Sequence, residues 1–540
     1  MSNFPWLTVT GAIPLAGAIV ISVLPGRSAP GAEADRRARA KLVKIIALVF
    51  SLATLAVSVV MAVQFNTHST QQFQFSQVYS WIPDFGVHYA VGVDGIALVL
   101  ILMSTVLMPV VVLASWNDAE GATGPVGAPP PQRSVKTYFA LMLVLETMMI
   151  GVFAATDVFL FYVFFEAMLI PMYFMIGSFG VGQRQYAAVK FLLYSLLGGL
   201  LMLVAVIALY VQSIHNGHGG TFLFTSLEHL ALSPTASKWL FLGFFVGFAI
   251  KAPLWPFHTW LPDAAASAQP GAAVLLVGVL DKVGTFGMIR YCLDLFPSAA
   301  HYFTPLVIVL AVVGVLYGAI VAIGQRDLKR LIAYTSISHM GLITLGIFVM
   351  TSEGQSGSVL YMVNHGFATG ALFLIAGFMI VRRRSQLISD YGGVQKVAPV
   401  LAGLFLIAGL AGLSLPGLST FVSEFLVLVG TFTKYEAAAV LATLGIILAA
   451  IYILWMYQRT MTGPVRDEVA KMPDLKAREL WAVVPLIALI IGLGVYPQPV
   501  LNIINPAVNQ TLVQLHTKDP APTAVTTGSG QHALGKELKP

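Results

Sequence analysis

Residues 239–264 read WLFLGFFVGFAIKAPLWPFHTWLPDA. The stretch has the length and apolar content of a helix that crosses a bilayer, which needs about 20 mostly apolar residues. Lys251, Pro253 and Pro256 interrupt it near its centre. A charge inside a bilayer is costly and usually has a functional role, and each proline removes a backbone hydrogen bond. The stretch therefore predicts a broken transmembrane helix that carries a functional lysine.

The composition of the whole chain also indicates a membrane protein. Of the 540 residues, 57% are hydrophobic and only 10% are charged, whereas soluble proteins have about 25% charged residues. So few charges cannot cover a surface that faces water. The single cysteine, Cys292, excludes a disulfide framework, and also an iron–sulfur cluster or thiolate zinc site held by this chain alone. We predict an all-α polytopic membrane protein.

Apolar runs that end at polar, proline or glycine clusters predict about 14 transmembrane helices. These spans are 6–24, 43–63, 89–114, 138–155, 158–179, 189–211, 239–261, 272–292, 303–323, 331–350, 359–381, 400–431, 437–457 and 480–496. Most of the 30 lysines and arginines lie in alternate loops between these spans. The positive-inside rule makes those loops cytoplasmic and places both termini on the outer side. The net charge of +6 is then explained by topology, and no nucleic-acid binding is predicted.

The order of the spans predicts an internal duplication. The broken segment is the seventh predicted span, and a second break, LSLPGLSTFVSE at 413–424, lies in the twelfth. Two such breaks five spans apart predict two five-helix repeats, and because five is odd the repeats insert with opposite topology. The predicted segments are an N-terminal three-helix segment at 1–136, inverted repeats at 137–292 and 303–457, and a last helix with a flexible outer tail at 458–540.

Several ionisable residues lie inside the predicted spans. They are Glu146, Glu166, Lys251, Asp281, Lys282 and Glu424, with the histidines His339 and His365. Any one of them could be an inert structural group, but charges of both signs spread over several helices favour a proton route. A buried lysine loses its proton readily and regains it beside a carboxylate, and histidine exchanges protons near neutral pH. A sugar or drug site would not need such a series.

Four long motifs resemble those of one family. They are FFEAMLIPMYF at 164–174, KAPLWPFHTWLPDA at 251–264, KRLIAYTSISHMG at 329–341, and the stretch 413–425. Together they resemble the antiporter-like membrane-arm subunits of respiratory complex I, the proton-translocating NADH–quinone oxidoreductase. At the position of Glu424 the chain resembles the M-type subunits, which carry glutamate there, whereas the sister L and N subunits carry lysine. One departure is Ala265-Ala266-Ser267, where the family often places a histidine.

The resemblance implies a role for each buried group. It makes Glu166 the fifth-helix glutamate, Lys251 its partner, Lys282 the relay lysine of the eighth helix, and Glu424 the terminal group of the twelfth. His339 and His365 match polar positions on the central axis. Glu146 is outside the family's usual set and is expected to have a supporting role.

The resemblance also implies a function and partners. The chain is expected to translocate protons as a subunit of NADH:quinone oxidoreductase in the bacterial cytoplasmic membrane, without cofactors of its own. FMN, iron–sulfur clusters, NADH and quinone are expected in partner subunits, and the L and N sisters and the lipid bilayer are the expected neighbours. The alternatives are a subunit of a multi-subunit sodium/proton antiporter, a solute transporter of two six-helix halves, and an inert scaffold or quinone-site subunit.

Overall fold

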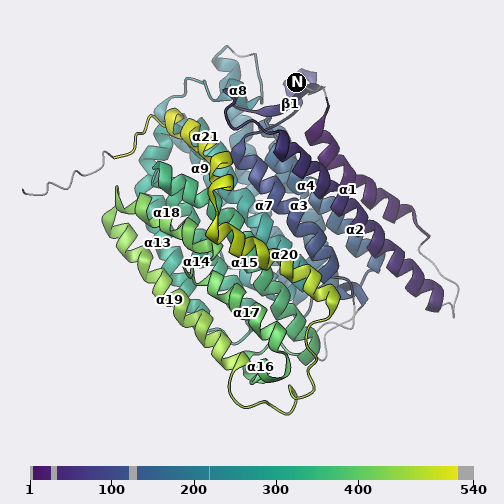
Figure 1. Cartoon of the computed structure of the whole chain (residues 1–540). Coiled ribbons are helices and arrows are strands. Elements are labelled where there is room, and N and C mark those ends of the chain that lie inside the picture. Colours follow the sequence, from purple (N-terminus) through teal and green to yellow (C-terminus); the bar gives the residue numbers. More distant parts are fainter. Residues whose placement is uncertain (1–3, 26–32, 121–130, 218, 521–540) are drawn as a thin grey trace, which may run out of the picture.

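The computed structural model describes residues 4–25, 33–120, 131–217 and 219–520, and shows a bundle of long helices (Figure 1). The α-helices are α1 (Trp6–Val23), α2 (Glu33–Gln64), α3 (Gly95–Ala114), α4 (Val135–Ala154), α5 (Val158–Ala167), α6 (Leu169–Phe179), α7 (Arg184–His215), α8 (Phe224–Leu227), α9 (Pro234–Lys251), α10 (Trp260–Ser267), α11 (Pro270–Leu275), α12 (Asp281–Gly287), α13 (Pro297–Ile323), α14 (Leu328–Phe348), α15 (Ser352–Arg383), α16 (Val394–Val397), α17 (Pro399–Gly412), α18 (Ser419–Phe432), α19 (Glu436–Met461), α20 (Ala477–Val495) and α21 (Gln498–Gln514). Two π-helices, η3 (Leu276–Leu280) and η4 (Met288–Leu293), flank α12. The predicted flexible tail from residue 521 onward lies outside the described residues.

Within the described ranges, 12 helices are long and apolar enough to cross a membrane. The predicted seventh and twelfth spans are not among them, because each is built from two shorter helices, α9 with α10 and α17 with α18. The structure therefore confirms both predicted breaks. The total of about 14 spans and the inverted relation of the repeats stay predictions.

The first break forms where α9 ends at Lys251. Pro253 and Pro256 follow, and neither can donate a backbone hydrogen bond. The end of the helix is closed by two other donors: the Leu254 amide donates to the Ala249 carbonyl at 2.9 Å, and the Trp260 indole donates to the Ile250 carbonyl at 2.9 Å. The irregular backbone is thus stabilised by hydrogen bonds within the protein, as backbone at membrane depth requires.

The predicted all-α fold class is confirmed, and a short two-stranded sheet at one end of the bundle is added to it. Strands β1 (Gln74–Ile82) and β2 (Val87–Val93) form an antiparallel hairpin in which Tyr79 pairs with Tyr89. The predicted span at 89–114 therefore begins too early, because its first residues belong to β2. Asp94 separates the strand from the helix: its side chain accepts a hydrogen bond from the Ala97 amide at 2.8 Å and caps α3.

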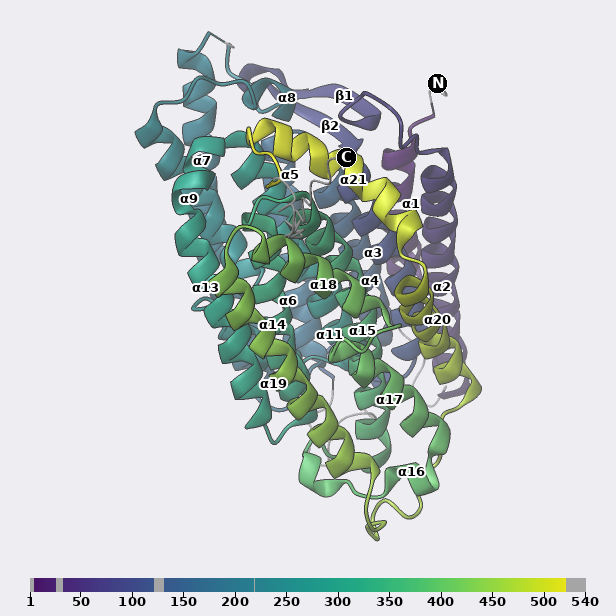
Figure 2. The ribbon, with the colours of Figure 1, turned by 60° about the vertical axis from the view of Figure 1, so that its left-hand side comes forward.

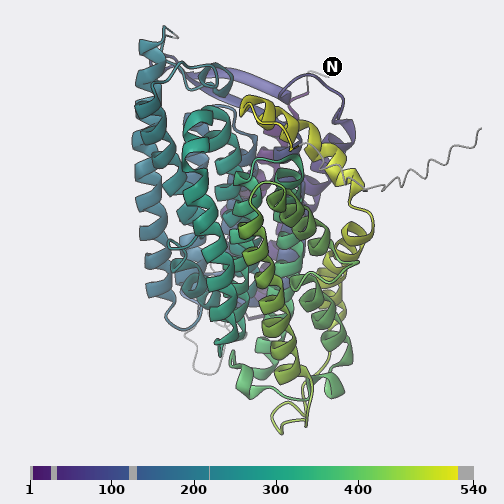
Figure 3. The same ribbon diagram turned by 90° about the vertical axis from the view of Figure 1, so that its left-hand side faces the viewer.

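Helix α21 was also missed, because it lacks a membrane-length apolar run. It lies across the ends of other helices on the same side as α8, β1 and β2, and α16 lies at the opposite side (Figure 2). We call these two sides the hairpin end and the α16 end. The view in Figure 3 shows the same two ends. Two basic residues lie at the α16 end: Arg382 in the last turn of α15, and Lys396 in α16. Arg382 donates to the Asp474 carbonyl, and the Asp474 carboxylate accepts from the Val400 amide of α17.

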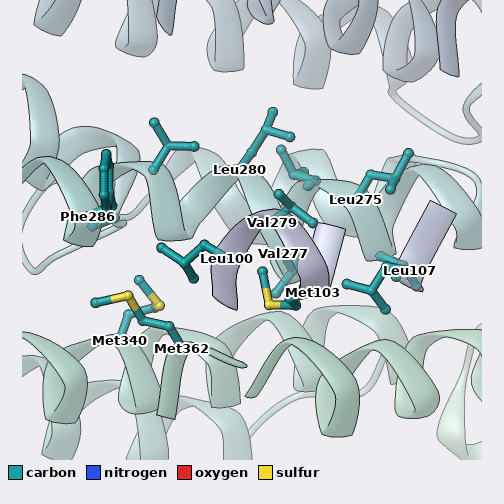
Figure 4. Packing of buried hydrophobic residues seen from close by; sticks show 14 of the residues in the cluster. Leu100, Met103, Leu107, Leu275, Val277, Val279, Leu280, Phe286, Met340 and Met362 are labelled. Atoms are coloured by element: carbon teal, nitrogen blue, oxygen red, sulfur yellow. The ribbon is translucent and has the colours of Figure 1, made fainter. Parts of the chain in front are cut away.

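The central helices are the most buried. In α11–η4 and in α15, every residue of an 18-residue membrane-length stretch is buried, whereas in α1 and α2 only 33% and 28% of the residues in such a stretch are buried. Figure 4 shows Leu100, Met103 and Leu107 of α3 beside Leu275 and Val277, which belong to α11 and η3. Close packing of this kind excludes water from the surroundings of any polar group nearby. Asp281 and Lys282 of α12 and His365 of α15 are therefore buried among closely packed side chains.

The docking of α21 can be tested at Gly95, the first residue of α3. A Cβ atom there would lie 1.8 Å from the Ile503 carbonyl oxygen of α21. We expect Gly95→Ala to displace α21 and to lower the free energy of unfolding by about 1–3 kcal/mol, measured by thermal unfolding of the purified protein. The control is Gly403→Ala in α17, where a Cβ meets nothing within 4 Å. An equal effect of the two substitutions would contradict the contact.

Candidate functional site

Glu166 lies in the last turn of α5, facing α7. A Cβ atom on Gly199 of α7 would lie 1.6 Å from the Glu166 Oε1 atom. On the preceding residue, Gly198, a Cβ would lie 3.1 Å from the Cα of Gly247 in α9. Because Gly198 and Gly199 have no side chains, α7 packs closely against α9 and against the Glu166 carboxylate in the same turn. The glycine pair therefore sets the distance between the carboxylate and α9.

Lys251 is the last residue of α9 and is only 1% exposed. Its ammonium lies 4.6 Å from the centre of the Phe165 ring, a cation–π contact. Among the described residues, neither Lys251 Nζ nor Glu166 Oε1 has a hydrogen-bond partner. The two charges interact electrostatically, but no ion pair within 4.0 Å joins them in the described part of the chain. The predicted Glu166–Lys251 pair is therefore adjacent without being in contact.

Lys282 lies near the middle of the buried segment between α11 and η4. Its Nζ donates to the Val277 carbonyl at 2.6 Å, lies 2.9 Å from Asp281 Oδ1, and hydrogen-bonds to His365 Nδ1 at 2.5 Å. An ammonium can only donate, so His365 Nδ1 is the acceptor and its proton is on Nε2 whenever Lys282 is charged. This contact joins α12 to α15.

A second series of contacts begins at His339 in α14. Its Nδ1 hydrogen-bonds to the hydroxyl of Tyr361 in α15, and that hydroxyl donates to Glu424 Oε1 in α18. The rings of His339 and His365 are 5.3 Å apart, centre to centre. Lys282, His365, His339, Tyr361 and Glu424 therefore lie in one series across four helices; the two histidines meet by a ring contact, and no hydrogen bond in the described residues joins them.

Close packing of α15 on α18 holds Glu424 in this series. A Cβ on Gly357 of α15 would lie 2.7 Å from the Leu426 Cβ of α18, so the helices approach at a glycine. Asn364 then donates from its amide to the Ser419 carbonyl at 2.6 Å, at the first residue of α18. The second backbone break ends at this residue. The break thus lets α18 start beside α15 with Glu424 directed at Tyr361.

The two groups meet where α12 packs against the end of α9. A Cβ on Gly284 would lie 2.6 Å from the Ala252 amide nitrogen, the residue after Lys251. Gly284 is in the same helix as Lys282. No hydrogen bond in the described residues joins the two lysines. The structure thus brings the predicted residues into two adjacent groups rather than one unbroken chain.

Glu146 lies apart from both groups. It is in α4, fully buried, and neither of its carboxylate oxygens has a hydrogen-bond partner among the described residues. An unpartnered buried carboxylate is costly when charged. Its supporting role stays a prediction.

Two buried residues were not singled out from the sequence. Tyr361 precedes His365 by four residues, so both lie on one face of α15; this spacing was the available signal. His258 lies in the break between α9 and α10, 3% exposed, with its ring 4.9 Å from that of Tyr317 and neither ring nitrogen hydrogen-bonded in the described residues. For His258, the signal in the sequence was its position inside the predicted span 239–261.

The arrangement is suited to moving protons. Lysine, histidine, tyrosine and carboxylate groups each gain or lose a proton, and here several of them are buried and hydrogen-bonded to one another. Among the residues that the structure describes, no three or more His, Cys, Asp or Glu side chains are grouped to hold a metal ion.

Comparisons with known proteins agree on one family. Residues 155–451 match the model of the family described as NADH:quinone oxidoreductase/Mrp antiporter, TM. The chain is 54% identical to NADH-quinone oxidoreductase subunit M of Mycobacterium tuberculosis, and the match covers 97% of each chain.

Solved structures show the same fold. A chain of respiratory complex I from Thermus thermophilus superposes with a TM-score of 0.82 at 30% identity, covering 94% of this chain and 99% of that one. A chain of the Mrp complex from Dietzia gives a TM-score of 0.77 at 19% identity, covering 96% of this chain and 100% of the other. The second likeness shows the fold alone.

The contact between Glu166 and α7 can be tested by a double-mutant cycle. We expect Gly199→Ala to lower the free energy of unfolding by about 1–3 kcal/mol, because the new Cβ overlaps the carboxylate. In a Glu166→Ala background the same substitution is expected to cost much less, since the overlapping group is gone. Thermal unfolding of the four proteins measures the difference. Equal costs in both backgrounds would show that the clash lies elsewhere.

Proposed function

The chain belongs to the family of NADH:quinone oxidoreductase and Mrp antiporter membrane subunits, and from this premise we propose that it translocates protons as a membrane subunit of an NADH–quinone oxidoreductase. It performs no redox chemistry itself in this proposal. Electrons pass from NADH to quinone in partner subunits that hold FMN and iron–sulfur clusters, and the free energy released there drives the protons. The observation that carries the proposal is the series of titratable groups from Lys282 to Glu424, joined by hydrogen bonds except at the ring contact between His365 and His339.

The pair of Glu166 and Lys251 is the proposed point of control. Lys251 is buried without a hydrogen-bond partner among the described residues, so its charged form depends on the nearby negative charge of Glu166. A movement that brings the carboxylate closer favours the protonated lysine, and one that separates them favours release of the proton. Because no direct contact fixes the pair, a small shift of α5 or α9 changes this balance.

The proton then passes through the second group. Lys282 receives it beside Asp281, which offsets the charge of the ammonium at 2.9 Å. From Lys282 the proton moves to His365 and His339, whose rings are neighbours, and it reaches Glu424 for release at the outer side. Lys282 and His365 are hydrogen-bonded, and the rings of His365 and His339 are neighbours, which favours transfer between them.

The remaining parts of the proposal concern the arrangement in the membrane. We infer that the α16 end faces the cytoplasm, since the basic loops around Arg382 and Lys396 lie there. The residues 137–292 and 303–457 are then inverted repeats: the first supplies Glu166, Lys251 and Lys282, and the second supplies His339, His365 and Glu424. The L and N sister subunits are the proposed neighbours in the bacterial cytoplasmic membrane.

A sodium/proton antiporter subunit is the weaker alternative. The Mrp likeness is one of fold, whereas a full-length relative at 54% identity is named as an NADH-quinone oxidoreductase subunit. The alternative predicts pumping that depends on sodium ions, so pumping in sodium-free buffer distinguishes the two.

Removing either member of the control pair tests the function. We expect Lys251→Ala or Glu166→Ala in the assembled complex to lower NADH-driven proton pumping in membrane vesicles about 100-fold or more, because a proton-transfer group contributes roughly this much. Quinone reduction falls with it, since the two processes are coupled. Lys238→Ala, in the same helix, is the control: its Nζ lies 3.4 Å from the centre of the Tyr302 ring, away from the site. Full coupled activity in the Lys251 and Glu166 variants would refute the proposal.

The orientation is tested by labelling from each side of the membrane. The native Cys292 is buried, so Lys396→Cys at the α16 end and Thr70→Cys at the hairpin end give separate signals. We expect a membrane-impermeant maleimide to label Lys396→Cys only in inside-out vesicles and Thr70→Cys only in right-side-out vesicles. The reverse pattern would place the α16 end outside.

A further inference from the structure

Tyr361 occupies the junction between the central histidines and Glu424. The phenol is fully buried in α15, and its hydroxyl is hydrogen-bonded both to His339 Nδ1 and to Glu424 Oε1. The His339 and Tyr361 rings meet edge to face, with centres 5.7 Å apart. Tyr361 is therefore in contact with the group before it and the group after it in the series.

A direct transfer from His339 to Glu424 is poorly placed by comparison. His339 Nδ1 and Glu424 Oε1 are 3.5 Å apart, whereas N–H···O hydrogen bonds lie mostly at 2.7–3.2 Å. Tyr452 of α19, another polar side chain near the carboxylate, has no hydrogen-bond partner for its hydroxyl among the described residues. The hydroxyl of Tyr361 is thus the atom that completes the path.

We propose that Tyr361 is a proton-relay residue that passes the proton from His339 to Glu424. The inference rests on the proposed function and adds a residue to it. In the transfer, the Nδ1–H bond of protonated His339 breaks as a new O–H bond forms at the phenol. The original phenol O–H bond breaks at the same time, and its proton binds Glu424 Oε1. His339 ends neutral, Glu424 ends as a carboxylic acid, and the phenol keeps one proton throughout.

Because the phenol carries a single proton, the relay must be reset after each transfer. After a transfer, the hydroxyl proton comes from the His339 side and points back to Nδ1, which is now an acceptor. Before the next transfer the hydroxyl must rotate toward Glu424, and it does so only when Glu424 has lost its proton and accepts again. Release of the proton from Glu424 therefore resets the relay.

The sharpest test is Tyr361→Phe in the assembled complex, because it removes the hydroxyl and keeps the ring. We expect NADH-driven proton pumping to fall about 10-fold or more, with quinone reduction falling in parallel. Tyr452→Phe is the matched control: it removes a hydroxyl from an equally buried tyrosine near Glu424, and unchanged pumping is expected. Full pumping in Tyr361→Phe, or an equal loss in both variants, overturns the relay.

A second measurement separates a relay from a purely structural role. If Tyr361 and His339 act in one path, Tyr361→Phe combined with His339→Ala pumps no more slowly than His339→Ala alone. If Tyr361 only supports the packing, the two losses multiply, and that result overturns the relay.

Lys251→Ala, measured in the same vesicles, keeps the two proposals apart. Loss of pumping in Lys251→Ala with full pumping in Tyr361→Phe refutes the relay alone. Full pumping in Lys251→Ala refutes the proposed function itself.

Discussion

A charge in the interior of a membrane protein is costly unless it faces another charge, a polar group or a water-filled cavity. In this chain Lys282 and Glu424 have protein partners, whereas Lys251 and Glu146 have no hydrogen-bond partner among the described residues. Glycines let the helices approach each other closely near these groups. Gly199 of α7 lies beside Glu166, and Gly357 lies where α15 meets the helix of Glu424. Side chains larger than hydrogen at these positions would hold the helices apart. The polar contacts therefore depend on backbone approach as much as on the titratable residues themselves.

The two backbone breaks lie at the two ends of the proposed proton path, which runs from Lys251 to Glu424. Lys251 is the last residue of α9, where the negative end of the helix dipole favours a cation. Glu424 lies beyond the first turn of α18, so its position depends on packing against α15 rather than on the dipole. The breaks thus differ in what they do: the first creates an electrostatic environment, and the second orients a helix.

The sequence was sufficient for the elements whose physical signals are local. Membrane-length apolar runs and proline breaks predicted the bundle and both interrupted spans, and charge in an apolar context identified Lys251, Lys282 and Glu424. It was not sufficient where the signal depends on another helix. The gap between Glu166 and Lys251 is set by packing along α7, and Tyr361 resembles any core tyrosine until its neighbours are known. The hairpin was missed because its second strand is largely apolar and only Asp94 separates it from the apolar run of α3.

The depth of these residues has an electrical consequence. Lys282, His339 and His365 each lie near the middle of a membrane-spanning helix. A proton that moves among them travels largely in the plane of the membrane and crosses little of the transmembrane voltage. The work against that voltage, about 2.3 kcal/mol per charge per 100 mV, therefore falls on the steps by which the proton enters and leaves. The internal transfers would keep nearly the same rate whether the membrane is energised or not.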